Sequence, residues 1–597
     1  AGQRVTQRAA ERCDEAAGSA ADSSGHRQAA APPTERKSPR QGFTTYHFPM
    51  EFQTLKELYA HSIKAYGNRP SFSMLERESM TYNDFDDRVE YVRGILLGAG
   101  IGSGDKVALL SSNMPNWSVC YFAIVTSGMV AVPILPDFSG SELDMIITHS
   151  EAKALFVSDK LYTRISKEVV ERMNIVVRTK NLGIIARTSF ELGAMTEPKP
   201  EDLAVIIYTS GTTSSPKGVM LTHYNLAAQI QMDRDLFFVK PDDIFLSILP
   251  LSHTYECSLG MLLPFMCGAS VVYVDRPPTA SNLLPALREV RPTVMLSVPL
   301  VIEKIYKSQV AGRFNSSGLL RKLYGKPFFR KMIHRIAGRQ LYKLFGGRLR
   351  FFGIGGAKLD TEAERFLSEG KFPYAIGYGL TETAPLIAGA VPSNVRLGST
   401  GPVLPGIEAR LEDTNEFGEG ELVVKSPCTM LGYYKNPELT AEVFTPDGWF
   451  RTRDLCAFDP DGFLYIKGRL GSMIVGPNGE NIYPEDIESV LNSHFLISDS
   501  IVTQEQGKLV ALVRFDRAEL EKRYHEFRDD LATTMEDIKA DVIKYVNSKV
   551  NKSSKIATIE EQEHDFEKTP SHKIKRYLYT RKPKEEKEHP QTPADKR

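Results

Sequence analysis

Short apolar runs alternate with helical patterns along most of this chain, and this alternation restricts the fold more than any other feature. Helical segments such as 141–150 and 361–369 lie between some of the runs. Strands that are buried on both faces and separated by helices are typical of parallel sheets. The sequence therefore predicts an α/β fold with parallel-rich sheets flanked by helices. The runs that we interpret as strands are KVALL (106–110), AVPIL (131–135), ALFVS (154–158), LAVIIYTS (203–210), ASVVYV (269–274), TVMLSV (293–298) and LRFFGIGG (349–356).

The chain is long enough to need more than one hydrophobic core. At 597 residues it exceeds the size that one core usually serves. The pattern changes near residue 469, where the strand-like LVALVRF (509–515) and a polar helical stretch of roughly 516–550 follow. We therefore predict a large N-terminal domain over 42–468 and a small, mobile α+β domain over 469–580.

Both ends of the chain have compositions that are typical of disorder. Residues 1–41 are rich in Ala, Arg, Ser and Pro, and the acids among them argue against an organellar transit peptide. The tail from 581 to 597 is charged and contains proline. We predict that neither segment is folded.

Charge, cysteines and apolar segments favour a protein of the cytoplasm. Basic residues (74) equal acidic residues (74), so the net charge gives no sign of a nucleic-acid partner, and none is expected. The six cysteines include no CxxC pair, which favours reduced thiols. The two long apolar stretches, 107–136 and 248–274, are interrupted by turn residues or charges, so we interpret them as buried segments and not as membrane spans.

Residues 304–350 form a basic segment with thirteen Lys or Arg and no Asp or Glu. Apolar side chains such as Phe328, Met332 and Ile336 recur in it at helical spacing. One interpretation is a surface helix whose positive field helps to hold phosphate-bearing substrates. The other is an amphipathic patch that rests on anionic lipid at the inner face of a membrane. The sequence does not separate them.

The stretch YTSGTTSSPKGV (208–219) concentrates hydroxyls, glycines and one lysine. It follows a strand and precedes a helix that we expect to start near Thr222. A glycine- and hydroxyl-rich turn presents backbone N–H groups that bind phosphate oxygens, and Lys217 adds a positive charge. The order of residues is not that of a Walker loop. The alternative is a plain Ser/Thr-rich surface loop.

Further motifs follow this loop, and together they resemble the AMP-forming adenylating superfamily of acyl-CoA synthetases, luciferases and peptide-synthetase adenylation domains. Three motif sequences, PLSHTYE, PNGENIYPEDIE and TPSHKIKR, together with the basic insert before LRFFGIGG, are most similar to those of bacterial long-chain fatty acyl-CoA synthetases. The resemblance covers residues 50–580 or so. The motifs are LPLSHTYE (249–256), GIGGAKL (353–359), GYGLTETAP (377–385), GELVVKSPCTMLGYY (420–434), GWFRTRDL (448–455), KGRLGSMIVGPNGENIYPEDIE (467–488) and EKTPSHKIKRYLY (567–579).

This resemblance implies a two-step ligase that uses ATP, Mg²⁺ and coenzyme A. A fatty-acid carboxylate attacks the α-phosphorus of ATP to form acyl-AMP, and the thiol of coenzyme A then displaces AMP. Two alternatives stay open: an enzyme that loads a carrier-protein thiol, and a non-catalytic regulator that binds nucleotide or lipid. Acyl chain length and oligomeric state are not readable from the residues.

The resemblance also implies a role for each motif residue. Glu382 would bind Mg²⁺, Thr381 would contact the α-phosphate, and Tyr378 would pack on adenine beside Gly379. The β- and γ-phosphates would be held by Thr209, Ser210, Gly211, Thr212, Thr213 and Lys217. Backbone at Gly355, Gly356 and Ala357 would approach the purine closely.

The remaining implied roles concern the ribose, the carboxylate and the moving domain. Asp454 would accept hydrogen bonds from the ribose hydroxyls, and Arg469 would contact ribose or phosphate. Lys573 would neutralise charge at the α-phosphate, and His253 would orient the acyl carboxylate without acting as a general base. The small domain would rotate between the two steps.

Three positions depart from the family pattern. Gly471 occupies the hinge position, where many relatives carry Asp or Lys. Ser214 stands where a loop glycine is usual, and Arg453 stands where a glycine usually precedes the ribose-binding aspartate. Glycine at 471 has the backbone freedom that a hinge needs. The changes at Ser214 and Arg453 remove no chemical group, so we expect activity.

Overall fold

The computed structural model describes residues 50–209, 216–274, 279–307, 324, 326–476, 481–524, 531–569 and 573–580. All of them belong to one of the two units into which the chain divides, Thr45–Arg597. The predicted disordered segments 1–41 and 581–597 lie outside the described residues, as does the departure at Ser214.

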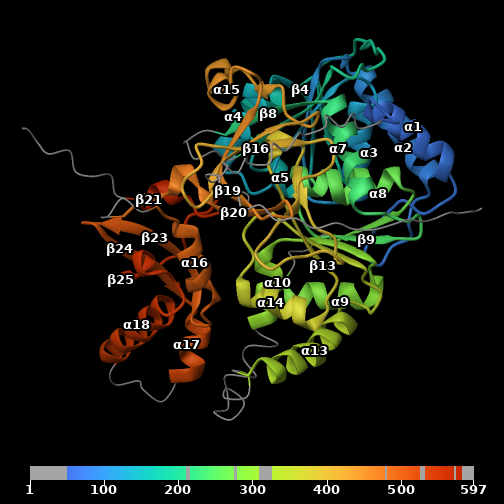
Figure 1. Cartoon of the computed structure of the whole chain (residues 1–597). Coiled ribbons are helices and arrows are strands. Elements are labelled where there is room, and N and C mark those ends of the chain that lie inside the picture. Colours follow the sequence, from blue (N-terminus) through green and yellow to red (C-terminus); the bar gives the residue numbers. More distant parts are fainter. Residues whose placement is uncertain are drawn as a thin grey trace, which may run out of the picture. The chain divides into compact units, whose positions relative to one another are not determined.

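One sheet of eight strands has the order β18-β8-β7-β3-β2-β4-β5-β6; its strands β4 and β8 are labelled in Figure 1. Its central strands pair in parallel, as predicted. β2 (Lys106–Leu110) matches the predicted run, and its alternate side chains, such as Val107 and Ala108, enter two different hydrophobic cores. Burial on both faces explains the unbroken apolar run. The other strands are β3 (Val130–Pro133), β4 (Ala152–Val157), β5 (Ile175–Arg178), β6 (Ile184–Arg187), β7 (Leu203–Thr209), β8 (Lys217–Thr222) and β18 (Gly432–Tyr433).

A second sheet of seven strands has the order β1-β10-β9-β11-β12-β13-β14. Its strands pair in parallel as far as β13, and β14 returns antiparallel to β13. At this return a Cβ on Gly379 would lie 1.8 Å from the carbonyl oxygen of Pro385, so the close approach of the backbones requires glycine. The strands are β1 (Phe72–Met74), β9 (Ile244–Ser247), β10 (Ser270–Tyr273), β11 (Val294–Ser297), β12 (Phe351–Ile354), β13 (Tyr374–Gly379) and β14 (Leu386–Gly389).

A third, antiparallel sheet was not predicted from the sequence. Its order is β15-β20-β19-β17-β16. No residue of β16 is fully buried, so this strand lacks the apolar signal of a buried strand. The members are β15 (Gly401–Pro402), β16 (Glu408–Glu412), β17 (Gly420–Lys425), β19 (Phe450–Phe458) and β20 (Phe463–Arg469).

Among the described residues, the strands that follow Arg469 pair with one another and with no earlier strand. They also have a separate hydrophobic core. The change of pairing falls after Arg469, the last residue of β20, and the domain limits 42–468 and 469–580 stay predictions. These strands are β21 (Ile474–Val475), β22 (Asn481–Ile482), β23 (Ile497–Glu505), β24 (Lys508–Phe515) and β25 (Ile556–Glu561).

Helices cover the sheets, and the one that follows the hydroxyl loop begins where it was predicted. Thr222 caps α7: its side chain accepts from Asn225 N, and Asn225 Oδ1 accepts from Thr222 N at 2.9 Å. The helices are α1 (Leu55–Tyr66), α2 (Tyr82–Gly98), α3 (Pro115–Val125), α4 (Gly140–Ser150), α5 (Asp159–Tyr162), α6 (Lys167–Glu171), α7 (His223–Leu236), α8 (Leu263–Met266), α9 (Ala280–Val290), α10 (Pro299–Tyr306), α13 (Pro327–Leu344), α14 (Thr361–Gly370), α15 (Pro437–Val443), α16 (Pro484–Ser493), α17 (Arg517–Tyr524) and α18 (Leu531–Asn547). Short helical turns are η1 (Glu256–Leu262), η3 (Thr381–Thr383), η4 (Leu470–Ser472), η5 (Lys552–Ser554) and η6 (Arg576–Leu578).

The two long apolar stretches fold into the interior. The first contains the buried helix α3 and then β3, and the second contains η1, α8 and β10. In the part of the chain that the structure describes, no helix is both long and apolar enough to cross a bilayer. The five described cysteines are buried free thiols: Cys120, Cys257, Cys267, Cys428 and Cys456.

Candidate active site

Strands β7 and β8 bracket the predicted phosphate loop. Their antiparallel register sets Thr209 opposite Lys217 at the mouth of the loop. The side chain of Tyr208 fixes this hairpin, because its hydroxyl lies 2.7 Å from His149 Nδ1. Ser210, Gly211, Thr212 and Thr213 lie outside the described residues, so their phosphate contacts stay predictions.

Tyr433 links Lys217 to Glu382. The Lys217 ammonium lies 5.6 Å from the centroid of the Tyr433 ring, which is a cation–π distance. The Tyr433 hydroxyl donates to Glu382 Oε1 at 2.9 Å. Burial lowers the pKa of Lys217, and the Glu382 carboxylate acts in the opposite direction. A cation and a carboxylate therefore share one cleft.

Glu382 fits a magnesium ion that is bound mainly through phosphate. Mg²⁺ usually takes one or two protein carboxylates and completes its shell with substrate phosphates and water. Among the described residues no group of three His, Cys, Asp or Glu side chains that could hold a metal ion occurs. Thr381 lies beside Glu382 at the start of η3, and its contact with the α-phosphate stays a prediction.

Tyr378, Asp454 and Arg469 form a hydrogen-bonded group between the second and third sheets. Asp454 on β19 and Arg469 on β20 are register partners. Arg469 Nε donates to Asp454 Oδ1 at 3.1 Å, and the Tyr378 hydroxyl donates to Asp454 Oδ2 at 2.7 Å. Asp454 is 2% exposed, and its charge raises the pKa of Arg469. A buried carboxylate with paired oxygens is a fixed acceptor for neighbouring hydroxyls.

The turn after β12 provides an open backbone edge. Gly355 is buried and Gly356 and Ala357 are exposed. Gly356 has φ +87°, a conformation that glycine adopts readily. A Cβ on Gly355 would lie 3.3 Å from the ring of Tyr255, so the side chain of Tyr255 packs directly on this turn. Glycines here leave the backbone accessible to a flat ligand.

His253 is neutral near pH 7 and has a defined tautomer. Burial and, to a lesser extent, the charge of Lys573 lower its pKa to about 4. The Tyr255 backbone N–H donates to His253 Nδ1 at 3.3 Å, so the ring proton resides on Nε2. A neutral ring that offers an N–H suits a residue that orients a carboxylate, and a pKa this low does not suit a general base at pH 7.

Lys573 lies within electrostatic reach of residues from the preceding sheets. Crowding by protein and the Arg469 guanidinium lower its pKa to about 8, while Asp454 and Glu382 act in the opposite direction. Lys573 is nevertheless exposed to solvent. Its charge interacts with those of Arg469, Asp454 and Glu382 and lowers the pKa of His253, while the catalytic roles of these residues stay predictions.

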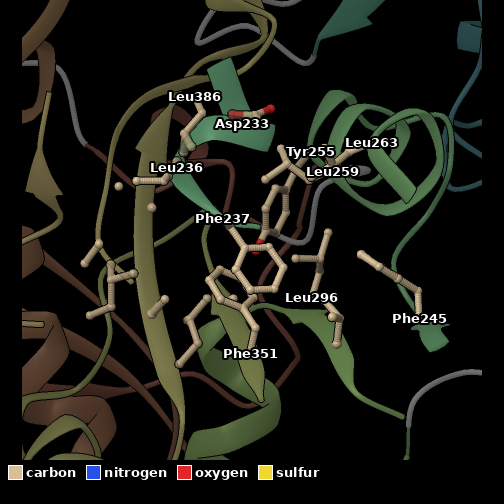
Figure 2. A pocket seen from close by; sticks show the side chains of 18 residues that line it. Asp233, Leu236, Phe237, Phe245, Tyr255, Leu259, Leu263, Leu296, Phe351 and Leu386 are labelled. Carbon is tan, nitrogen blue, oxygen red and sulfur yellow. The ribbon is translucent and has the colours of Figure 1, made fainter. Parts of the chain in front are cut away.

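An apolar cavity is lined by residues next to two of the motifs (Figure 2). Gly353 and Gly377, which adjoin the turn after β12 and Tyr378, line it, and so does Tyr255. The rest of the wall comes mainly from apolar side chains of α7, η1 and the second sheet. Tyr255 therefore both packs on the turn after β12 and lines the cavity.

Three residues of this region were missed from the sequence. Tyr433 was part of a quoted motif, but the link that it makes between Lys217 and Glu382 depends on tertiary structure. Tyr255 was likewise quoted without a role. Asp233 lines the cavity but carries no sequence signal, because an acid on a helix is usually solvated.

Arg453, which stands where the motif usually has a glycine, has a positive φ, a conformation that glycine adopts readily. Its φ is +59°, a region that disfavours bulky residues. Its side chain reaches Glu442 at 3.4 Å, and its charge is one of those that lower the pKa of Lys217. Arg453 therefore adds a further cation near Lys217.

Comparison with known proteins places the chain in a family. Residues 59–434 match the family described as AMP-binding enzyme. The long-chain-fatty-acid–CoA ligase FadD15 of Mycobacterium bovis is 30% identical over 543 residues, which cover 82% of this chain and 88% of that protein. The peroxisomal long chain acyl-CoA synthetase 7 of Arabidopsis thaliana is 28% identical over 539 residues, which cover 81% and 76%.

Solved structures resemble the fold. ATP-bound MatB from Rhodopseudomonas palustris has a TM-score of 0.70 at 24% identity, covering 88% of this chain and 98% of that one. The o-succinylbenzoate coenzyme A synthetase MenE from Bacillus subtilis, in complex with AMP, has a TM-score of 0.69 at 21% identity, covering 87% and 97%. These likenesses confirm the predicted α/β fold class.

The environment of Lys573 predicts how its reactivity depends on pH. The neutral amine reacts with acetic anhydride, so we expect the labelling of Lys573, followed by mass spectrometry, to rise with pH around a midpoint of about 8. In Arg469→Gln the midpoint moves up, because a repelling cation is removed, and in Glu382→Gln it moves down. A midpoint that neither variant moves would show that Lys573 does not lie in this cleft.

Proposed function

Because the chain belongs to the AMP-binding enzyme family, we propose that it is an ATP-dependent, AMP-forming ligase that joins a long-chain fatty acid to coenzyme A. The main support is the continuity of two unlike spaces. A charged cleft contains Lys217, Glu382 and Asp454, and an apolar cavity starts beside it at Tyr255. This pairing of charged groups with an apolar cavity suits a substrate that has a charged end and an apolar chain.

In the proposed first step, a carboxylate oxygen bonds to the α-phosphorus of ATP. The bond from that phosphorus to the bridging oxygen breaks, and pyrophosphate leaves. Asp454 accepts from the ribose hydroxyls, Lys217 holds the phosphate tail, and Lys573 offsets charge at the α-phosphate. Mg²⁺, when held by Glu382, neutralises phosphate charge. Positioning and electrostatics account for rate in such transfers.

In the proposed second step, the thiol sulfur of coenzyme A bonds to the acyl carbon. The bond from that carbon to the AMP oxygen breaks, and the thiol proton passes to solvent. The change of step requires the small domain to rotate away with Lys573. At the hinge position, a Cβ on Gly471 would meet nothing within 4 Å, so a glycine there provides backbone freedom and is not required by space.

A panel of acids from acetate to oleate tests this function. We expect pyrophosphate release with oleate to exceed that with acetate by at least about 100-fold in kcat/KM, because each buried methylene contributes about 0.8 kcal/mol. With coenzyme A present, AMP and acyl-CoA should form in equal amounts. The measurement is coupled pyrophosphate detection with and without coenzyme A.

Lys573→Ala is the control for that assay. It should slow pyrophosphate release by roughly 100-fold or more and still convert supplied oleoyl-AMP and coenzyme A to oleoyl-CoA. Equal loss of both steps would contradict the proposal that Lys573 acts only in adenylate formation. Acyl transfer to a carrier protein without formation of acyl-CoA would show that the acceptor is the carrier protein and not coenzyme A.

We also propose that α13 rests on an anionic membrane surface. Phe328, Met332 and Ile336 are spaced by four residues and are 75%, 48% and 52% exposed. Lys331 and Arg335 are exposed beside them. Apolar side chains flanked by cations are typical of interfacial helices. This arrangement favours the lipid interpretation of the basic segment over the phosphate-field one.

The opposite face of α13 is bound to the protein. Arg330 Nη2 donates to Glu369 Oε1 at 2.8 Å, and His334 is fully buried beside the same carboxylate. A Cβ on Gly338 would lie 2.5 Å from the carbonyl oxygen of Gly370, so α13 and α14 pack closely. Arg330 is therefore unsuitable for a test of lipid binding.

Charge reversal on the exposed face tests the membrane proposal. Lys331→Glu with Arg335→Glu and Arg339→Glu should reduce co-sedimentation with phosphatidylglycerol vesicles by about tenfold or more, since each basic residue near such a surface contributes about 1 kcal/mol. The matched control carries three glutamates at Lys160, Lys167 and Arg172, which are exposed on another surface. Equal vesicle binding by both variants would contradict the membrane proposal and would favour the interpretation that the basic segment helps to hold phosphate-bearing substrates.

A further inference from the structure

The apolar cavity contains one carboxyl group among the described residues that line it. That group belongs to Asp233 on α7. In Figure 2 the carboxyl oxygens of Asp233 and the hydroxyl of Tyr255 are the polar tips among the labelled side chains. An acid in such a wall is unusual, because burying a polar group without partners costs free energy.

One oxygen of this carboxyl group has no partner in the described part of the chain. Gln229 Nε2 donates to Asp233 Oδ1 at 2.8 Å. Asp233 Oδ2 makes no hydrogen bond to a described residue, although the residue is only 1% exposed. Buried polar atoms are rarely left in this state, so a group that pairs with Oδ2 is expected in the cavity whose wall Asp233 helps to form.

The protonation of Asp233 indicates what kind of ligand group suits it. Burial raises the pKa of Asp233 to about 8, so the group is mostly neutral at pH 7. If Oδ2 carries the proton, it donates; if the proton lies toward Gln229 with the amide reversed, Oδ2 accepts. A hydroxyl group satisfies both arrangements because it is donor and acceptor at once.

Asp233 lies in the wall of the apolar cavity, and no lysine or arginine is among the described residues that line it. A substrate group that meets Asp233 there belongs to the acyl chain and not to its charged carboxyl end.

We propose that the cavity selects acyl chains that carry a hydroxyl group, which hydrogen-bonds to Asp233. This inference rests on the proposed ligase function and narrows its substrate class to hydroxy fatty acids. A plain chain leaves Oδ2 unpaired, and a site built to pair with a hydroxyl discriminates against the analogue that lacks it.

The test compares palmitate with hydroxypalmitates whose hydroxyl moves stepwise along the chain. In the full-length enzyme, kcat/KM for pyrophosphate release should peak at one hydroxyl position, roughly tenfold or more above palmitate. In Asp233→Leu the ratio of that acid to palmitate should fall to about one. Asp233→Asn, which keeps a polar group of the same size, should retain part of the preference.

Leu236→Ala is the matched control, because Leu236 lines the same cavity without a polar atom. It changes the shape of the wall, so it should affect both acids and leave their ratio unchanged.

The outcomes distinguish failure of the hydroxyl preference from failure of the ligase function. If the wild-type enzyme uses palmitate as well as every hydroxy acid, or if the preference survives in Asp233→Leu, the inference is overturned and the ligase function stands; a buried water then satisfies Oδ2. If no acid supports pyrophosphate release, the ligase function fails and this inference fails with it.

Discussion

The paired carboxylate of Asp454 is the interaction on which the rest of the site depends. It joins Arg469 at the end of β20 to Tyr378 on β13, so it ties the third sheet to the second. Because Asp454 is buried, leaving its charge unpaired would cost about 1–3 kcal/mol or more. The same pairing fixes Arg469, the last residue of β20, whose charge lowers the pKa of Lys573.

The site combines two environments that favour different chemistry. Lysine, arginine and carboxylate groups surround the cleft, whereas the adjoining cavity is apolar except for Asp233 and Tyr255. Tyr255 contributes to both, since it packs on Gly355 and lines the cavity. A carboxylate at this junction would have its charged end among donors and its chain out of water, which is the arrangement that activation of a fatty acid requires.

The sequence alone was enough to predict the strands that are buried on both faces, but it did not reveal the strands of the third sheet. β2 was predicted to the residue because both its faces meet a core. In the third sheet, β16 gave no signal because none of its residues is fully buried, so it lacks an apolar run. Motifs located Glu382 and Lys217, but Tyr433, which connects them, and Asp233 become functional candidates only through tertiary contacts.

The central claim is that Asp454 holds the ribose of ATP, and a cycle of residue and ligand changes tests it most directly. Calorimetry gives the Kd of MgATP and of Mg-2′,3′-dideoxy-ATP for the wild-type protein and for Asp454→Ala. We expect the dideoxy nucleotide to bind at least about tenfold more weakly to the wild type, since hydrogen bonds to a charged group contribute about 1.5–3 kcal/mol. In Asp454→Ala the two nucleotides should bind alike. An undiminished preference for ATP in that variant would contradict the account.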